Sequence, residues 1–492
     1  MSSSPKILLS LVLILNSFPT LLTAQETRSN ANPDDEWIEE YRPLALDIID
    51  FTNSDEALFW KRLAYLTDYY PHRLSGSTML EGAIDYLYDS MKADGFDRVF
   101  KQEVMVPHWE RNEESARFIG PYEKALRILG LGRSVGTPPE GIRAPVLVVN
   151  SFEDLEARAD EAEGKIILWN VPFTTYGETV QYRVRGAVEA ARVGAVGSLL
   201  RSVSPYSSQT PHTGGMRYEE GVPKIPSAAI SIEEAELMQR FQDRGEPFEV
   251  LLKMGAKTHP DALSHNLIAE LKGWEKTNEY VVIGGHIDSW DTGQGVMDNA
   301  SGVIVAWEAL RILKALGFQP RRTIRVVAWT NEENGLRGGR AYLRMVEEDG
   351  TLQGHQLAFE ADAGVFQPYG FGFSGTDEAF EILQPILQLT GAVGVTEMRR
   401  GSSGVVDVGP LHARGVPIMG INTDRERYFW YHHSETDTLD KQDPKDIAKV
   451  IAATAILAAV TADMEPFLPR TVYPSPSSSP SSSPSTTTEK SK

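Results

Sequence analysis

The last part of the chain alternates between two patterns of apolar positions. Short runs that are mostly apolar are typical of buried strands; these are EYVVIGG (279–285), RTIRVVAWT (322–330), QLAFEA (356–361) and VPIMGI (416–421). Other segments repeat apolar residues every three or four positions and predict helices; these are 298–316, 338–348, 378–391 and 444–464. Strands and helices that follow one another in this way predict a parallel sheet with helices on both faces.

Two further sections precede this one. The segment 58–96 has apolar residues at helical spacing, and 98–107 alternates like a strand, so 25–119 is expected to be helical and then extended. In 120–260, short β-branched runs and two amphipathic helical segments predict a small α/β domain. We find no cluster of potential ligands in 120–260, and we expect it to wall a cleft and to carry no chemistry of its own.

The two ends of the chain differ from the globular part. In residues 1–24, Lys6 precedes an apolar run and Ala24 offers a small residue for cleavage, which resembles a secretory signal peptide too short to span a bilayer. The Pro/Ser/Thr-rich segment 471–492 has no apolar face and predicts a disordered tail. Since the chain has 0 cysteines, we expect an exported protein without disulfides, in a periplasm or an extracellular medium.

Size and charge exclude some functions. The 492 residues are too many for one ordinary core, and the formal net charge of −20 argues against nucleic-acid binding, which needs a basic surface. No stretch after the N-terminal segment is long and apolar enough to span a membrane. Nucleic acid and a membrane span are therefore not expected.

Chemically reactive side chains follow each of four predicted strands. His286 and Asp288 follow the first, Glu332 and Glu333 the second, Asp362 the third and, after a loop, His433 the fourth. Ligands of open α/β sheets bind at the carboxyl ends of the strands, so we expect these side chains to meet at one edge of the sheet.

The residue types at this edge indicate a metal site. Histidine and carboxylate ligands without a thiolate suit zinc or another first-row divalent ion. Asp298, at the start of a predicted helix, is held tightly enough to aim a carboxylate at a metal, and Asp288 is the candidate to orient His286. Adjacent Glu332 and Glu333 allow one glutamate to bind metal while the other takes a proton from water.

The motifs GGHIDSWDTGQG, GVMDNASG, WTNEENGLRG, FEADAG and HHSETDT resemble peptidase family M28, which comprises two-zinc aminopeptidases and carboxypeptidases. The resemblance implies a zinc-exopeptidase-like fold, that is, a mixed, largely parallel sheet sandwiched by helices, and a possible homodimer. It also implies that 120–260 is a protease-associated domain inserted into a peptidase domain formed by 25–119 and 261–470. It also implies five ligands for two zinc ions, namely His286, Asp362, Glu333, His433 and Asp298, with Asp298 bridging. Glu332 would be the general base, Asp288 would orient His286, and a cis peptide would follow Asp298. The family pattern selects His433, with its neighbour His432 as the alternative.

These features predict an exported dizinc exopeptidase that hydrolyses dipeptides or short peptides. A glutaminyl cyclase-like acyl transferase and a non-catalytic receptor-like protein on the same fold are the alternatives. The inserted domain argues against the first and the complete ligand set against the second.

Several residues near these motifs have no assigned role. Arg399 or Arg400 could hold a substrate carboxylate, although a plain surface loop is the favoured interpretation there. An oxyanion could be stabilised by one of four residues, namely Arg425, Arg427, Tyr428 and Tyr431. The glycine pattern GFGFSG (370–375) is interpreted as a strand and not as a nucleotide loop, because its phenylalanines alternate with glycines.

Overall fold

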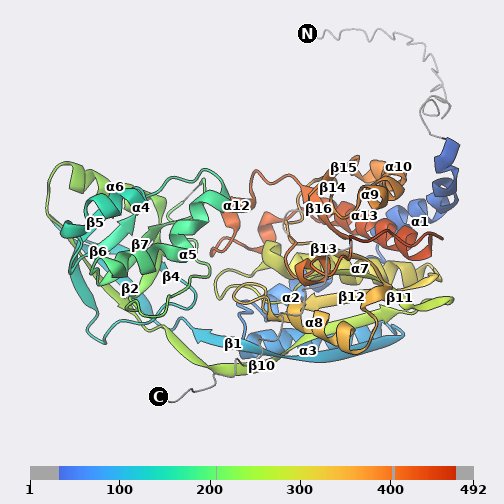
Figure 1. The fold of residues 1–492 in the computed structure, drawn as a ribbon, viewed down its shortest axis with the longest axis horizontal. Coiled ribbons are helices and arrows are strands. Elements are labelled where there is room, and N and C mark those ends of the chain that lie inside the picture. Colours follow the sequence, from blue (N-terminus) through green and yellow to red (C-terminus); the bar gives the residue numbers. More distant parts are fainter. Residues whose placement is uncertain (1–32, 207, 402–404, 472–492) are drawn as a thin grey trace, which may run out of the picture.

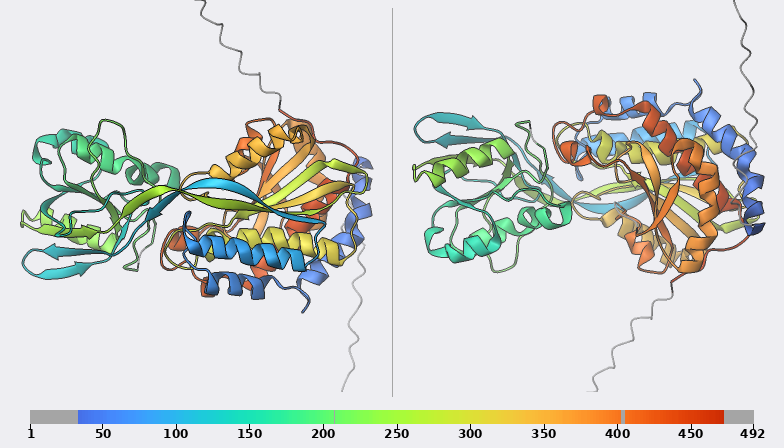
Figure 2. Two further views of the ribbon diagram at one scale, coloured as in Figure 1. Left: turned by 90° about the horizontal axis from the view of Figure 1, so that it is seen from below. Right: turned by 90° about the horizontal axis from the view of Figure 1, so that it is seen from above.

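A computed structural model describes residues 33–206, 208–401 and 405–471, which form two lobes joined by a long two-stranded ribbon (Figures 1 and 2). The predicted signal segment 1–24 and, apart from residue 471, the predicted tail lie outside the described residues. Among the described helices, none is long and apolar enough to cross a membrane.

The larger lobe is built on a mixed eight-stranded sheet in the order β1-β10-β12-β11-β13-β16-β14-β15. Four neighbouring strands in its centre, β12, β11, β13 and β16, run parallel, whereas β1, β10 and β14 pair antiparallel with their neighbours toward the centre. The strands are β1 (Arg98–Glu110), β10 (Lys257–Leu271), β11 (Lys276–His286), β12 (Arg322–Trp329), β13 (His355–Glu360), β14 (Pro368–Ser374), β15 (Glu397–Arg400) and β16 (Ile418–Thr423). The predicted mixed, largely parallel sheet is therefore confirmed, and GFGFSG lies in strand β14.

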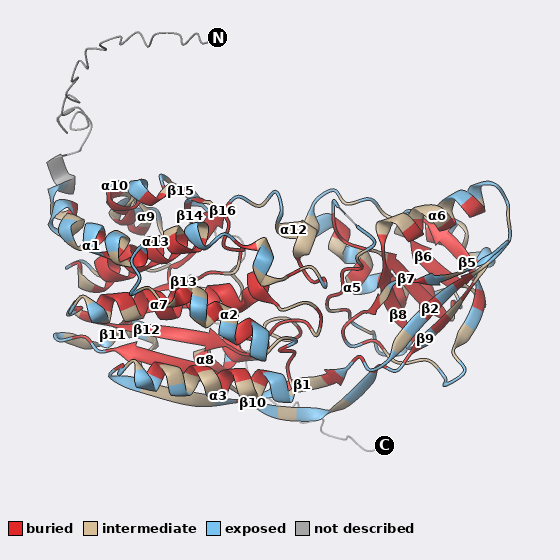
Figure 3. Cartoon of the chain, turned by 180° about the vertical axis from the view of Figure 1, so that it is seen from behind, coloured by how far each residue is buried: buried red, intermediate tan, exposed pale blue. Residues whose placement is uncertain are grey.

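Helices cover both faces of this sheet because its central strands are apolar on both sides (Figures 2 and 3). Val281 and Ile283 point into a core formed with α1, α2, α3, α7 and α13, while Val282 points to the other face, into a core formed with α8 and α11. The helices of this lobe are α1 (Arg42–Thr52), α2 (Phe59–Tyr69), α3 (Thr78–Ala93), α7 (Ser301–Ala315), α8 (Arg337–Glu348), α9 (Asp377–Leu383), α10 (Leu387–Thr390), α11 (Gly409–His412), α12 (Tyr428–Tyr431) and α13 (Pro444–Asp463).

One predicted helix is broken in the structure. The segment 378–391 forms α9, a short 3-10 turn at Gln384–Ile386, and α10. Pro385 lies at the break, where its ring and its missing N–H disrupt a continuous α-helix. The apolar spacing correctly predicted helical turns on both sides of the break. It did not take account of Pro385, which interrupts them.

The smaller lobe has an eight-stranded sheet of its own, in the order β3-β2-β9-β5-β6-β7-β8-β4. Its strands are β2 (Glu114–Ile119), β3 (Glu123–Leu126), β4 (Ile128–Gly130), β5 (Ile142–Val149), β6 (Ile166–Trp169), β7 (Gly197–Arg201), β8 (Ser227–Ile230) and β9 (Glu249–Met254); its helices are α4 (Phe152–Ala157), α5 (Tyr176–Arg192) and α6 (Ile232–Asp243). The sheet begins earlier than the expected boundary at residue 120, because β2 pairs with β3 and β9 of this lobe.

A two-stranded ribbon formed by residues 104–110 of β1 and 257–264 of β10 connects the lobes (Figure 2). Beyond Leu267, β10 also pairs with β12 and so joins the large sheet. The smaller lobe also contacts α12 directly. Phe429 of α12 stacks on Tyr176 with ring centroids 5.1 Å apart, and its carbonyl accepts a hydrogen bond from the Ser204 hydroxyl at 2.6 Å. The two lobes therefore meet beside the carboxyl ends of the central strands.

Candidate active site

Side chains from the carboxyl ends of the four central strands converge, as the sequence predicts. His286 is the last residue of β11, Glu333 follows β12, Asp362 follows β13, and His433 lies in the loop after α12. Because β12, β11, β13 and β16 are parallel neighbours, their carboxyl ends share one edge of the sheet.

Asp298 lies between two histidines. It belongs to the turn Val296–Ala300 that precedes α7. Its Oδ1 is 3.1 Å from His286 Nε2, and its Oδ2 is 3.2 Å from His433 Nε2. The peptide bond from Asp298 to Asn299 is cis, as the resemblance implied. The two oxygens of one carboxylate therefore face two different imidazoles.

A second carboxylate completes the group around each imidazole. Asp362 Oδ1 lies 3.3 Å from His286 Nε2, and Glu333 Oε2 lies 3.0 Å from His433 Nε2. The other oxygen of Glu333 is buried and has no hydrogen-bond partner among the described residues. Imidazole and carboxylate donors without a thiolate, together with an orphaned carboxylate oxygen, fit a zinc-type cation shared by the two groups.

The protons on the two imidazoles follow from their outer contacts. His286 Nδ1 lies 2.9 Å from the carbonyl of Asp288, and His433 Nδ1 lies 3.2 Å from the carbonyl of Thr213. With a metal bound, each Nδ1 would donate its proton to its carbonyl and each Nε2 would give its lone pair to the ion beside Asp298, which is the tautomer that binds metal.

His432 lies farther from the carboxylates than His433. Its Nε2 is 3.6 Å from Asp298 Oδ2, and its ring stacks on that of His433 at 3.6 Å. His433 alone of the pair is in contact with Glu333. This geometry supports His433 as the ligand, although both rings lie within reach of Asp298.

Asp288 holds the loop that carries the two glutamates. Its Oδ1 accepts the backbone N–H of Glu332 at 3.0 Å, and its Oδ2 accepts that of Glu333 at 3.2 Å. Its carboxylate lies 3.6 Å from His286 Nδ1, farther than its own carbonyl. Asp288 therefore contacts His286 mainly through the main chain and the glutamate loop through its side chain.

Two buried residues that we did not single out support the Asp298 turn. Asp437 accepts the backbone N–H groups of Met297 at 2.8 Å and Asp298 at 3.1 Å. Arg73 is fully buried and donates to the carbonyls of Ile287 and Gly295 at 2.8 and 2.7 Å. The sequence signal for Asp437 was its place in the HHSETDT motif, whereas nothing in the local sequence marked Arg73.

The electrostatics of the site follow from burying several carboxylates together. Burial raises the pKa of Glu332 well above its ordinary value, and burial with the adjacent charge of Asp298 raises the pKa of Glu333 to about 7. Burial also opposes ionisation of Asp298, but hydrogen bonds to His286 and His433 outweigh it and keep its pKa well below the usual range. A divalent cation would favour the ionised form of every carboxylate here.

These groups line a cavity of about 350 Å³ between the lobes. Glu332, Arg425 and Tyr428 line it from the larger lobe, and Tyr176 and Arg183 line it from α5 of the smaller lobe. Arg425 and Tyr428 were among our candidates for substrate contacts, whereas Arg427 and Tyr431 are not among the lining residues.

Arg183 is the residue that the sequence interpretation missed. Its Nη1 lies 3.4 Å from His433 Nδ1 and donates to the Thr213 carbonyl at 3.3 Å, and its Nη2 donates to the Tyr176 hydroxyl at 2.8 Å. We expected the insertion to wall the cleft without chemistry of its own, and Arg183 of α5 lies in that wall. Its contact with the loop that carries His433 joins segments far apart in the sequence, so the local sequence does not show it.

Arg399 and Arg400 do not reach this cavity. Both lie on β15, where Arg399 pairs with Glu397 at 2.8 Å and Arg400 pairs with Asp377 at 2.7 Å. These exposed ion pairs agree with the favoured interpretation of this segment as a surface feature.

Known proteins resemble this chain in sequence and in structure. The profile of peptidase family M28 matches residues 266–458. Carboxypeptidase Q from Xenopus laevis is 45% identical over 435 residues, which are 88% of this chain and 92% of the relative. The crystal structure of a peptidase M28 precursor from Shewanella amazonensis SB2B has a TM-score of 0.84 at 35% identity, covering 89% of this chain and 100% of that chain.

A zinc aminopeptidase from Bacillus subtilis shares the fold with a TM-score of 0.64 at 20% identity, covering 83% of this chain and 95% of that chain. The likeness in sequence to carboxypeptidase Q spans both lobes, and the family match includes all five residues that we predicted to bind metal. The chain therefore belongs to peptidase family M28 and is a metallo-exopeptidase.

Proposed function

We propose that this protein is an exported dizinc exopeptidase that hydrolyses dipeptides or short peptides. The observation that carries the proposal is the position of Asp298, whose two carboxylate oxygens face His286 and His433 separately at 3.1 and 3.2 Å. One carboxylate shared between two sets of donors is the arrangement expected for two adjacent ions.

The donors divide between the two ions by distance. His286 and Asp362 would hold one zinc, Glu333 and His433 would hold the other, and Asp298 would touch both. Zinc in such a site acts as a Lewis acid, which lowers the pKa of water and polarises the scissile carbonyl.

Glu332 would be the general base. It lines the cavity beside the proposed metal ligands. Its backbone N–H donates to Asp288 Oδ1 at 3.0 Å, which holds its main chain in place. In the reaction it would take a proton from the attacking water and deliver it to the leaving amine. Burial raises the pKa of Tyr428 well above its ordinary value, so its hydroxyl stays protonated and can donate to the developing oxyanion.

Two arginines suit a substrate that carries a free carboxylate. Arg183 and Arg425 approach the same cavity from different lobes. A guanidinium pairs well with a carboxylate, so either one could bind the carboxyl terminus of a peptide. The volume of about 350 Å³ is near the lower end for ligand cavities, which favours a short substrate. The name carboxypeptidase Q, borne by the relatives, agrees with recognition of a carboxyl-terminal residue.

Export rests on the sequence of residues 1–24, which lie outside the described structure. A protease-associated character of the smaller lobe and a homodimer that helps to close the cavity are also part of this proposal, on the strength of the family resemblance.

Hydrolysis of a peptide panel tests the proposal. The panel holds free dipeptides, the same dipeptides with a carboxyl-terminal amide, and longer peptides blocked at both ends. We expect free dipeptides to be cleaved, amidation to lower kcat/KM by about tenfold or more, and blocked peptides to resist. Cleavage of internal bonds in blocked peptides as readily as in dipeptides would show an open cleft and contradict the proposal.

A further inference from the structure

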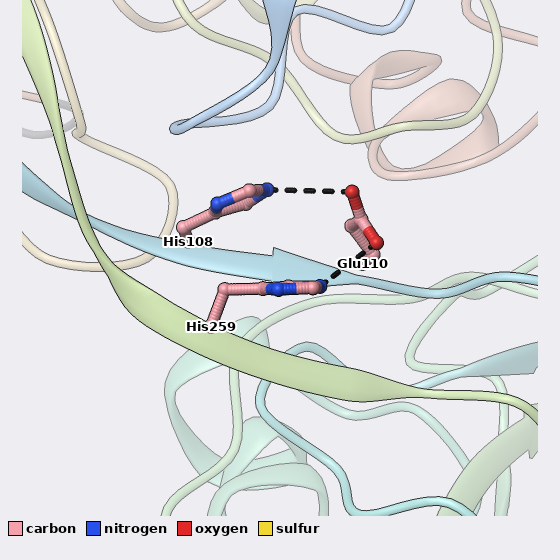
Figure 4. Close-up of side chains that lie close together, drawn as sticks. All are labelled: His108, Glu110 and His259. Atoms are coloured by element: carbon pink, nitrogen blue, oxygen red, sulfur yellow. Dashed lines mark hydrogen bonds and ion pairs between the residues drawn. The ribbon is translucent and has the colours of Figure 1, made fainter.

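A second group of metal-binding side chains lies on the ribbon between the lobes, away from the catalytic cavity. His108, Glu110 and His259 bring two imidazoles and one carboxylate together, with their ligand atoms all within 4.8 Å of one another (Figure 4). None of the three lines the catalytic cavity.

Strand register explains why these side chains meet. His108 of β1 pairs directly with His259 of β10, so both project from the same face of the ribbon. Glu110 follows two residues after His108 and therefore lies on that face too. The intervening Trp109 points the other way and is buried against Leu74 and Trp290. The ribbon thus has one anchored face and one face with the three polar groups.

The backbone at this point is constrained. The register shifts between Val106 and His108, at Pro107, and Pro260 follows His259 on the partner strand. Gly76, at a φ of +87°, passes so close that a Cβ there would lie 2.8 Å from the Cβ of His108. These features restrict the backbone of both strands and the Cβ of His108, so the two histidines start from fixed main-chain positions.

The distances fit a small divalent cation. Glu110 Oε2 lies 2.9 Å from His259 Nε2, and Glu110 Oε1 lies 3.4 Å from His108 Nε2. Donors around a tetrahedral zinc are about 3.3 Å apart, given bonds of about 2.0–2.1 Å. The two rings lie nearly parallel, with centroids 4.5 Å apart and planes at 23°, and direct both Nε2 atoms at one carboxylate.

A hydrogen-bonded His–Glu–His group is the plainer interpretation of the same contacts. A hydrogen bond from one imidazole is enough to orient a carboxylate. Here two imidazoles from opposite strands approach the same carboxylate, which favours a metal site over a hydrogen-bonded group. Their side chains are only 24% and 23% exposed, while Glu110 is 48% exposed and leaves room for water as a fourth donor. Histidine and carboxylate donors of this kind select zinc or a neighbouring first-row ion over calcium or magnesium.

We propose that His108, Glu110 and His259 bind a zinc-type divalent ion that clamps the two strands of the ribbon. Because the ribbon joins the lobes, an ion held by both strands fixes the register on which the position of the smaller lobe depends. That lobe carries Arg183 to the catalytic cavity, so the clamp stabilises the arrangement of the cavity without taking part in the chemistry.

Zinc counting on the full-length purified protein tests this site. Wild type and a His108→Gln/His259→Gln double variant are equilibrated with the same buffered free zinc, and bound metal is measured by mass spectrometry. We expect the double variant to hold one equivalent less than wild type, with dipeptide hydrolysis within about twofold of wild type, because the catalytic ions remain. We also expect added zinc to raise the Tm of the variant less than that of wild type.

His265→Gln is the matched control. His265 is also on β10 and also faces a glutamate, with its Nδ1 3.2 Å from Glu81 Oε2, but it is not part of a three-donor group among the described residues. This variant should keep the wild-type zinc count. If the double variant fails to fold, Glu110→Gln decides by the same count, since its side chain is nearly half exposed. An unchanged zinc count in the folded variant would overturn the proposal and leave a hydrogen-bonded group.

Discussion

Glu332 and Glu333 are adjacent in the sequence but have different surroundings. Glu333 is in contact with His433 at 3.0 Å, whereas Glu332 lines the cavity and forms no ion pair with the histidines of the described site. Asp288 accepts the backbone N–H groups of both glutamates, one with each carboxylate oxygen. It therefore holds the main chain from which the two side chains leave in different directions. The difference between neighbours can be tested directly by replacing each in turn.

Glu332→Gln should abolish turnover while keeping metal. An amide oxygen cannot accept the proton that a carboxylate accepts, so we expect kcat to fall by about a hundredfold or more. The zinc content and Tm should stay near wild type. Glu333→Gln is the matched comparison, and it should lose zinc as well as activity. Near-normal rates in a zinc-loaded Glu332→Gln protein would show that another residue is the base.

Replacing Asp298 should release more metal than replacing Asp362. Asp298 faces both histidines, whereas Asp362 lies near His286, so Asp298→Ala should release both catalytic ions and Asp362→Ala mainly one. Metal analysis of the purified variants, at matched free zinc, measures the difference. Equal partial losses in the two variants would contradict the bridging role.

At the scale of the elements, the large sheet separates its polar groups by position along the strands. The proposed metal ligands lie past the carboxyl ends, while a buried network lies farther back, at the start of β13. There the Tyr342 hydroxyl accepts from Arg325 at 2.8 Å and lies 2.9 Å from His355 Nε2, and His355 Nδ1 donates to the Thr351 carbonyl at 3.0 Å. His355 is therefore held as the neutral tautomer between β12, α8 and β13.

This network predicts a dependence of stability on pH. Burial lowers the pKa of His355 to about 3, whereas an unfolded histidine titrates near 6.5. Between these values the unfolded state binds more protons, so the free energy of unfolding falls as pH falls, by up to about 1.4 kcal/mol per pH unit from this residue. Above about pH 6.5 the effect is absent.

Denaturant unfolding of wild type and His355→Asn between pH 7 and pH 4 measures this contribution. The variant should be less stable at pH 7, because it loses the contact with Tyr342, but its stability should fall less steeply toward pH 4. Contributions from the metal site are common to both proteins and cancel in the difference. Parallel curves for the two proteins would show that His355 titrates normally in the folded state.

At the scale of the whole molecule, the smaller lobe completes the catalytic cavity. Arg183 reaches His433 from α5, and an antiparallel bridge between His212 and Ser434 joins the lobes at the same place. The ribbon of β1 and β10 connects the lobes on the side away from α12 (Figure 1). Substrate recognition is therefore expected to depend on both lobes.

Arg183→Ala should impair recognition of a carboxyl terminus. Losing a charge-assisted hydrogen bond of about 1.5–3 kcal/mol should lower kcat/KM for free dipeptides by about ten- to a hundredfold. Amidated dipeptides, already poor substrates, should lose much less. Arg185→Ala, on the same helix but 44% exposed and paired with Glu189, is the control and should behave like wild type. An equal loss on both substrate types, with zinc released, would show that Arg183 only supports His433.

The alternation of strands and helices in the larger lobe, and the strand ends that carry the proposed ligands, could be predicted from the sequence alone. The physical reason is that the spacing of apolar residues reports which face of a strand or helix is buried, and this is a local property. Parallel neighbouring strands end at the same edge of a sheet, so His286, Glu333 and Asp362 had to meet once β11, β12 and β13 were neighbours. The HHSETDT motif identified His433 as a candidate. Apolar periodicity could not do so, because a long loop separates that residue from β16.

Which residues far apart in the sequence lie together became visible in the folded molecule and not before. Arg183 meets His433 through the packing of α5 against the loop after α12, and His108 meets His259 through a strand register set at Pro107. The start of the smaller sheet at Glu114 likewise follows from pairing with β9, across the whole insertion. Contacts of this kind depend on register and on the packing of whole elements, which no local pattern of apolar and polar residues records.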